Sequence, residues 1–156
     1  MQEGTRNLLY FAYGEHMSED EMLRAFPHAR MAGLARLDGY ALCFTGRDGA
    51  AKPGIEPREG ASVPGRVGSL PETEIDALDS AIGGPTAARR EIRSMNVGGM
   101  NLPVLVYVTT PGQTKGRPGF LDYTIMQEAY QAAGEDTAPL VEAAKKSCAV
   151  KAEGIS

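Results

Sequence analysis

The stretch Leu8-Leu9-Tyr10-Phe11-Ala12-Tyr13-Gly14-Glu15-His16-Met17 carries the strongest fold signal in the chain. Residues Leu8 to Tyr13 form a continuous apolar run rich in aromatic side chains, which is typical of a strand buried on both faces. Gly14 ends this run and precedes a polar loop. Ser18 and Glu21 then make a capping box, so the sequence predicts a helix of about two turns directly after the loop. A buried strand, a polar junction and a capped helix therefore follow one another.

The remainder of the chain contains more predicted strands than predicted helices. The dipeptide Asp38-Gly39 favours a tight hairpin turn between two strands. The density of Gly, Pro and charge over 46–60 predicts a flexible loop with one short strand near Ile55. Gly83-Gly84-Pro85 is expected to end the second helix. The predicted strands span 8–13, 30–37, 40–45, 63–70, 90–95 and 102–109, and the predicted helices span 18–26, 71–82, 120–133 and 137–147.

The order of these elements indicates the fold class. Helices interrupt the strand series instead of alternating with it, which favours an α+β arrangement: a small mixed β-barrel with peripheral helices. A doubly wound α/β sheet is the less expected architecture. A chain of 156 residues fits one domain of ordinary size. We expect that domain to cover residues 1–147, with 148–156 as a flexible C-terminal tail.

Composition narrows the partners. The net charge is -4 and the isoelectric point is about 5.2, so the chain has no general attraction to nucleic acid or to anionic lipid. No apolar run approaches the ~20 residues that a membrane-spanning helix needs. The first seven residues lack a secretory pattern, so we expect a soluble, cytoplasmic protein whose partner is a small molecule. The sequence leaves the oligomeric state open.

Cysteine and histidine are too sparse to predict a metal centre. The chain has two of each, and Cys43 lies in an apolar run, which favours a buried free thiol and excludes a disulfide framework. His16 and His28 cannot build a three-histidine site. A mixed site of His16 with Glu15, Asp20 or Cys43 matches none of the known ligand spacings, so we expect no metal.

The junction after the first strand has two interpretations. Such a junction collects unpaired backbone amides, and the missing side chain of Gly14 would let a ligand carboxylate or oxyanion approach them. The alternative is an ordinary strand-to-helix turn in which Glu15 and His16 are solvated. The residues alone leave both interpretations open.

Several motifs in order resemble one family. Residues 9–17 are similar to a signature Tyr-Phe-Ala-Tyr-Gly-Ser-Asn-Met/Leu, and residues 35–44 to Ala-Arg-Leu-x-Gly-Tyr-x-Leu-x-Phe. Residues 63–70 with 77–79, and then 119–122, resemble a Val-x-Gly-Val strand, a helix ending in Leu-Asp and a Pro-x-Tyr-Leu-Asp motif. The signatures that these residues resemble are those of the gamma-glutamylcyclotransferase family, which includes the AIG2-like proteins. The resemblance implies a mixed alpha/beta barrel with one cavity.

The resemblance also implies a reaction. In this family the free α-amine of a gamma-glutamyl compound attacks its own γ-carbonyl, closing 5-oxoproline and expelling an amine, without a cofactor. One carboxylate can serve as base for the ammonium and as acid for the leaving nitrogen, while amides hold the oxyanion. The family's carboxylate is a Glu three residues after the Asp of the Leu-Asp motif. Here that Asp is Asp79, and the third residue after it is Ile82.

Two further departures accompany Ile82. Glu15 and His16 stand where the family has Ser-Asn, and Phe120 stands where it has Tyr. We therefore expect Glu15 to be a relocated acid–base group, with His16 as its partner or as an independent base near neutral pH. The residues expected to line the substrate cavity are Tyr13, Gly14, Met17, Ile82 and Phe120.

Other functions stay open at this stage. The alternative is a small-molecule-binding or accessory protein that kept the fold and the cavity. In that case the loss of the family's catalytic Glu abolished the reaction. The chain is also compatible with an unrelated lyase or hydrolase that uses Glu15 and His16. A negative Glu15 would repel a substrate carboxylate at the loop amides, so the ligand group there is alternatively a cation.

Overall fold

The computed structural model describes residues 6–82 and 87–155. Five strands form one sheet in the order β2-β3-β1-β5-β4, antiparallel throughout except for the parallel pair β1 and β5. The strands are β1 (Asn7–Ala12), β2 (Arg30–Thr45), β3 (Lys52–Pro71), β4 (Ala88–Val97) and β5 (Met100–Thr109). The helices are α1 (Glu19–Ala25), α2 (Ile75–Ile82), α3 (Phe120–Ala132) and α4 (Ala138–Ile155), with short 3-10 helices η1 (Glu15–Met17) and η2 (Glu72–Glu74).

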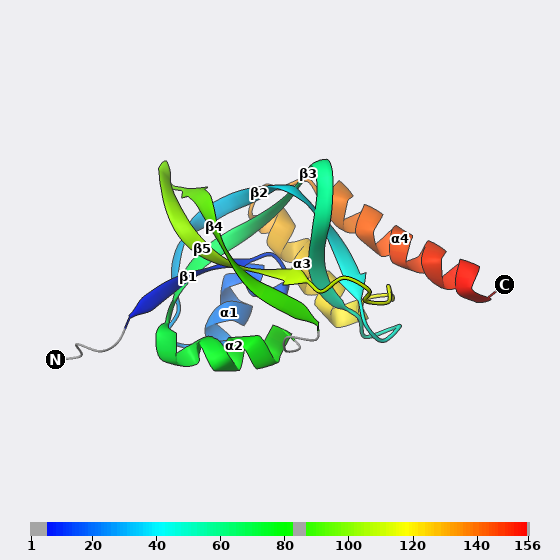
Figure 1. Ribbon diagram of the computed structural model, residues 1–156, viewed down its shortest axis with the longest axis horizontal. Coiled ribbons are helices and arrows are strands. Elements are labelled where there is room, and N and C mark those ends of the chain that lie inside the picture. The colour runs from blue at the N-terminus through cyan, green and yellow to red at the C-terminus, as the bar shows by residue number, and fades with distance from the viewer. Residues whose placement is uncertain (1–5, 83–86, 156) are drawn as a thin grey trace.

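The predicted mixed α+β class with peripheral helices is confirmed, but the sheet is not closed into a barrel. Its edge strands β2 and β4 have no hydrogen-bonded ladder between them in the described chain. The strands curve strongly, as Figure 1 shows, so the sheet resembles a barrel in outline while its two edges stay unpaired. Closure needs a matching register at both edges, and strand counts alone do not supply that information.

The sheet is covered by helices on both sides, and β1 shows how. Phe11 and Tyr13 face one core cluster, which α3 and α4 complete, whereas Tyr10 and Ala12 face a second cluster with α1 and α2. Successive side chains of a strand point to opposite faces, so the continuous apolar run fills both cores. In Figure 1, α1 and α2 lie below the strands, and α4 extends from the opposite side. The prediction of a strand buried on both faces is confirmed.

The predicted hairpin at Asp38-Gly39 is wrong, because β2 continues through it. The ladder to β3 pairs Asp38 with Ser62 and Tyr40 with Pro57, so the register shifts at this point. Gly39 takes a φ of 85°, a backbone conformation that suits glycine at a bulge as well as in a turn. The same dipeptide therefore bends one long strand instead of joining two.

The predicted flexible loop over 46–60 is also wrong for most of its length. Residues from Lys52 onward belong to β3, and only the connection before it is a loop. That connection is tied to residues 111–118: the amides of Gly46 and Gly49 donate to the carbonyls of Thr114 and Arg117, both at 2.9 Å. Long-range pairing outweighs the turn-forming composition of this segment.

The predicted helices are confirmed, and the predicted strands at 90–95 and 102–109 fall within β4 and β5, which pair antiparallel. The Glu21 amide donates to the Ser18 hydroxyl at 3.4 Å, as expected of a helix cap. The stop at Gly83-Gly84-Pro85 lies outside the described residues. Helix α4 runs to Ile155, so residues 148–155, expected as a tail, are helical; the prediction of a single domain stays a prediction.

Two further findings concern a membrane and a metal ion as binding partners. Among the described residues, no helix is both long and apolar enough to cross a membrane. Within the same residues, no group of three or more His, Cys, Asp or Glu side chains could hold a metal ion.

Candidate active-site pocket

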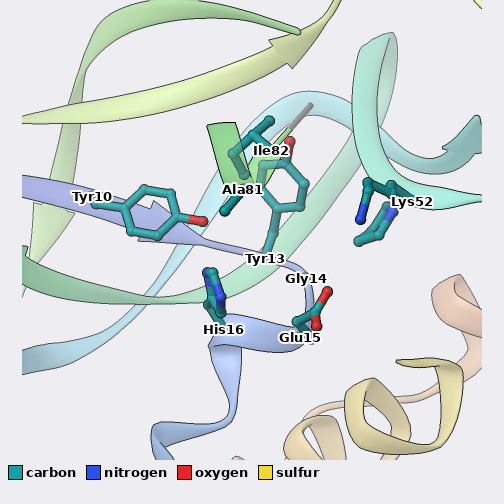
Figure 2. A pocket seen from close by; sticks show the side chains of 9 residues that line it. Tyr10, Tyr13, Gly14, Glu15, His16, Lys52, Ala81 and Ile82 are labelled. Atoms are coloured by element: carbon teal, nitrogen blue, oxygen red, sulfur yellow. The ribbon is translucent and has the colours of Figure 1, made fainter. Parts of the chain in front are cut away.

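A pocket of about 130 Å³ opens where β1 ends and η1 begins. We call it the junction pocket (Figure 2). Its walls come from four parts of the chain: the end of β1, η1, the start of β3 and the last turn of α2. The lining residues are Tyr10, Tyr13, Gly14, Glu15, His16, Lys52, Pro53, Ala81 and Ile82.

The turn into η1 brings Glu15 and His16 to this pocket. The amide of Met17 donates to the carbonyl of Gly14 at 3.0 Å, and the amide of Ser18 donates to that of Glu15 at 3.0 Å. These bonds fix the single 3-10 turn. An added Cβ on Gly14 would lie 2.7 Å from Cγ of Pro53. Glycine is therefore required for packing against β3, which differs from the expected close approach of a ligand.

Glu15 is half-buried in the junction pocket, and its pKa is raised. The main cause is burial, which disfavours the charged carboxylate. The negative charge of Asp122 raises the pKa further, the positive charge of Lys52 lowers it, and Glu21 raises it slightly. A carboxyl group in this setting exchanges protons closer to neutral pH than an exposed glutamate does.

His16 lies against aromatic rings. Its ring meets those of Tyr10 and Phe26 edge-on, with centroid distances of 6.4 Å and 5.7 Å. Burial lowers the pKa of His16, the charge of Glu21 opposes that shift, and Lys52 adds to it. The imidazole is accordingly neutral at pH 7. No hydrogen bond joins His16 to Glu15 among the described residues, so the structure does not pair them as the sequence suggested.

Tyr10 in β1 and Tyr13 just after it both line the pocket, but their hydroxyl groups have different contacts. The Tyr13 hydroxyl donates to the carbonyl of Tyr107 at 2.6 Å, and the Tyr107 hydroxyl donates to Asp79. Asp79 also lies 3.5 Å from the guanidinium of Arg90. This chain of contacts fixes Tyr13 and the end of α2 to β5, so Asp79 has a structural role.

Tyr10 has a different environment. Its side chain is 97% buried, because only 3% of its surface is exposed, and its hydroxyl points into the junction pocket in Figure 2. Burial, together with the charge of Glu15, raises the pKa of Tyr10, so the hydroxyl keeps its proton. In the described part of the chain the hydroxyl has no hydrogen-bond partner. Since this hydroxyl faces the open pocket (Figure 2), it is available to a ligand.

The structure brings together five of the seven residues expected at the site: Tyr13, Gly14, Glu15, His16 and Ile82 all line the junction pocket. Met17 does not, because it is fully buried in the core beneath η1. Phe120 does not either: it is 86% exposed at the start of α3. The motif positions predicted proximity, but side-chain direction depends on how η1 and α3 pack.

Two polar residues of the junction pocket were not predicted from the sequence: Tyr10, which was expected only as part of a buried strand, and Lys52. Lys52 lines the junction pocket opposite Glu15 (Figure 2). Its position was hidden because residues 46–60 read as a loop, and a lysine in a loop normally indicates a solvated surface. Only the pairing of β3 with β2 shows that residue 52 begins a strand next to η1.

A second, larger pocket of about 440 Å³ adjoins the first. We call it the loop pocket, because the connection between β2 and β3 forms one wall. It shares four lining residues with the junction pocket: Tyr13, Lys52, Pro53 and Ile82. Its remaining described lining comprises Thr45, Gly46, Arg47, Ala50, Gly54, Ala87, Ala88, Thr109 and Gln113.

Comparison with known proteins shows which family the chain belongs to. The model of the family described as "Gamma-glutamyl cyclotransferase, AIG2-like" matches residues 10–132, so the chain belongs to this family. The resemblance seen in the motifs is thereby confirmed. Cyclotransferases of this type act on small-molecule substrates. The comparison with curated protein sequences found no match.

Solved structures show the same fold at low sequence identity. A structure described as a gamma-glutamyl cyclotransferase is 20% identical with a TM-score of 0.74, covering 94% of this chain and 88% of that one. An uncharacterized human protein is 21% identical with a TM-score of 0.73, covering 94% and 87%. A yeast cyclotransferase described as specific to glutathione is 12% identical with a TM-score of 0.61, covering 90% and 96%.

Proposed function

We propose that the protein is a divergent gamma-glutamyl cyclotransferase-like enzyme in which Glu15 is the acid–base group. Its substrate is a small gamma-glutamyl compound or a related amide. One observation carries the proposal: Glu15 and Ile82 line the same pocket. Where α2 presents only an apolar side chain, η1 supplies a carboxylate on another wall of that cavity.

The reaction follows from the groups present. The α-amine nitrogen of the substrate attacks its γ-carbonyl carbon, forming the ring bond, and the amide C–N bond breaks. The α-ammonium first loses one proton to the solvent, which gives the nucleophilic amine. Glu15 then accepts the second proton, which this nitrogen loses as the ring closes, and donates it to the departing nitrogen, so the carboxylate is restored. The products are 5-oxoproline and a free amine. A single group moves the proton in both directions, so no second titrating residue is required.

An oxyanion forms when the amine attacks the carbonyl carbon, and the pocket offers hydrogen-bond donors for it. Tyr10 is a buried residue whose hydroxyl points into the pocket (Figure 2), retains its proton and has no hydrogen-bond partner among the described residues. The amides of Glu15 and His16 are not used within η1, because the first bond of that helix is donated by Met17. Preorganised donors at a developing negative charge contribute to catalysis because they need no reorganisation during the reaction.

The electrostatics of the pocket support an enzymatic role for Glu15. Its raised pKa brings the carboxyl closer to the pH at which it both accepts and donates a proton. The ammonium of the substrate is attracted to the ionised form. His16, neutral at pH 7 and packed against Tyr10 and Phe26, shapes one wall and remains an additional proton acceptor.

The test is a product assay for 5-oxoproline and free amine over a panel of gamma-glutamyl dipeptides and gamma-glutamyl amines. Glu15→Gln is expected to lower kcat by ~10²-fold or more, the usual contribution of general acid–base catalysis. Glu19→Gln is the matched control, because Glu19 is an exposed residue of the first turn of α1 and does not line this pocket. Equal activity of Glu15→Gln and wild type would refute the role of Glu15.

A binding protein is the second candidate, and Ile82 is the observation that favours it. An isoleucine at this wall cannot exchange a proton, and it lines both pockets. If the wild-type protein forms no product from any compound of the panel, while calorimetry detects binding of intact gamma-glutamyl compounds, the binding function is correct and the enzymatic one is not.

A further inference from the structure

A third pocket lies between the paired strands β2 and β3 and the helix α4, and its volume is about 420 Å³. We call it the helix pocket. In Figure 1, α4 leaves the body of the molecule beside β3. The helix pocket shares none of its described lining with the junction pocket or the loop pocket. Small-molecule sites span about 300–1,000 Å³, so this cavity can hold a ligand of its own. The lining residues are Arg36, Ala41, Leu42, Arg58, Ala61, Ser62, Pro139, Glu142, Ala143 and Lys146.

Positive charge predominates in the helix pocket. Arg36 comes from β2, Arg58 from β3 and Lys146 from α4, whereas Glu142 is the one acid in the described lining. The chain as a whole has a net charge of -4, so this concentration of cations is local. Arg58 and Lys146 form no ion pair with any side chain that the structure describes. Both can therefore bind an anion brought by a ligand.

Arg36 and Ser62 are held together at the wall of this pocket. Nη1 of Arg36 donates to the Ser62 hydroxyl at 2.9 Å. Nη2 of the same guanidinium donates to Glu135, which does not line the pocket. Glu135 therefore offsets the charge of Arg36 and fixes its direction. A serine hydroxyl that accepts a hydrogen bond keeps its own proton, so Ser62 can donate to a ligand oxygen.

A bulge in β3 brings Arg58 to the pocket. The register between β2 and β3 shifts here, so that residues 58–61 of β3 stand opposite Gly39 of β2. The extra chain turns at Gly60, whose φ is 81°, a backbone conformation that favours glycine. Bulges change the direction of side chains and are frequent beside functional sites. This one places a cation next to α4 that a regular ladder would direct along the sheet.

Part of the pocket wall is apolar. Leu42 and Ala143 are buried and belong to the core. Ala41 and Ala61 also line the pocket, and both are half-buried. A bare inorganic ion would leave this apolar surface exposed to water. An organic ligand would cover it while its anionic end meets the cations.

We propose that the helix pocket is a second binding site, and that its ligand is a small organic phosphate monoester. A phosphate monoester carries about -1.5 to -2 charges at pH 7, which matches the two unpaired cations, Arg58 and Lys146. Its three terminal oxygens can accept hydrogen bonds from both cations and from the Ser62 hydroxyl. A carboxylate has one charge and two oxygens, so it uses fewer of these donors. Glu142 repels the phosphate and weakens its binding. The site is separate from the reaction proposed for the junction pocket.

Calorimetry with phenyl phosphate and benzoate tests the site, because the two compounds share a ring and differ in the anionic group. Wild type is expected to bind phenyl phosphate ~10-fold more tightly than benzoate. Lys146→Gln should weaken the binding of phenyl phosphate by ~10-fold, as for one lost charge-assisted hydrogen bond. Lys145→Gln is the matched control, because this exposed lysine is the neighbour of Lys146 in α4 and does not line the pocket. Glu142→Gln should act in the opposite direction and tighten binding by ~2-fold or more.

Three results would overturn the site. The first is no binding of phenyl phosphate to wild type, or a Kd equal to that of benzoate. The second is an equal loss in Lys146→Gln and Lys145→Gln, which would show attraction to the general charge of α4. The third is a Kd that stays unchanged when Arg58→Gln and Lys146→Gln are combined, because the phosphate would then lie elsewhere. None of these measurements uses the formation of 5-oxoproline, so a failure of the proposed function leaves this test intact.

Discussion

The junction pocket and the loop pocket share a wall but present different charges. The first holds a half-buried carboxylate, Glu15, whose pKa is raised by burial. The second holds only cations, Arg47 and Lys52, among its described residues. Lys52 belongs to both. Under the proposed function this difference divides the two cavities in role, because Glu15 lines the junction pocket and is not among the residues that line the loop pocket.

The strongest test of this division moves the carboxylate to the shared wall. In the Glu15→Gln background, Ile82→Glu places a carboxyl group at the position where the motif resemblance implies the family's glutamate, and kcat is expected to recover by ~10²-fold. The measurement is steady-state formation of 5-oxoproline.

Ile82→Gln in the same background is the matched control, because it keeps the size and lacks the titrating group. Recovery in both double variants would show that polarity, not proton transfer, limits the reaction. No recovery with Ile82→Glu, in a protein that unfolds cooperatively like wild type, would place the acid–base position elsewhere.

Tyr10 tests the junction pocket without changing charge. Tyr10→Phe removes only the hydroxyl that points into the pocket (Figure 2), so kcat/KM should fall by ~10-fold, within the range for one lost hydrogen bond to a charged group. The loss should be equal for the gamma-glutamyl dipeptides and the gamma-glutamyl amines of the panel. Tyr123→Phe serves as control, because that tyrosine lines neither pocket. A loss confined to one class of compound would contradict the role of this hydroxyl as an oxyanion donor.

Lys52 lines both pockets. Its effect on the pKa of Glu15 can be measured from the pH dependence of kcat. Its positive charge lowers the pKa of Glu15, and Glu15 must be ionised to act as a base, so activity falls as pH falls through that pKa. Lys52→Gln raises the pKa further, and the acid limb of kcat should move to higher pH. An unmoved acid limb in Lys52→Gln would mean that Glu15 does not control the profile.

The smallest expected effect concerns stability. The pKa of Glu15 is raised by folding, so its carboxyl destabilises the folded state when pH is above that pKa and ceases to do so below the unfolded-state pKa. Glu15→Gln should therefore increase the free energy of unfolding at pH 8, by under ~1 kcal/mol, and less at pH 3.5. Urea denaturation at both pH values measures this. A stabilisation that is larger at pH 3.5 would reverse the sign and refute the assignment of the shift.

Local signals predicted the elements whose neighbours in sequence are also their neighbours in space. The apolar run of β1 and the Ser18 cap both rest on short-range chemistry, and both are confirmed. The segment 46–60 and the turn at Asp38-Gly39 were predicted wrongly, because β2 and β3 pair over a long length and override the local preference for turns.

The predictions for the candidate site were also partly right and partly wrong, for a similar reason. Glu15, His16 and Ile82 could be singled out because ordered motifs place them near one cavity, and the pocket contains all three. Phe120 and Met17 belong to the same motifs, yet one is exposed and the other is buried in the core. Motif order predicts which backbone segments meet, whereas side-chain direction depends on the packing of each helix.

The family and the α+β class could be predicted from residue identity and order alone. The position of Lys52 opposite Glu15, and a second cavity whose described lining contains Arg47 and no acid, follow from the packing of segments distant in sequence. The physical reason is that an electrostatic environment is a sum over groups distant in sequence. Glu15, Asp122 and Lys52 affect one another's charge only after the chain has folded.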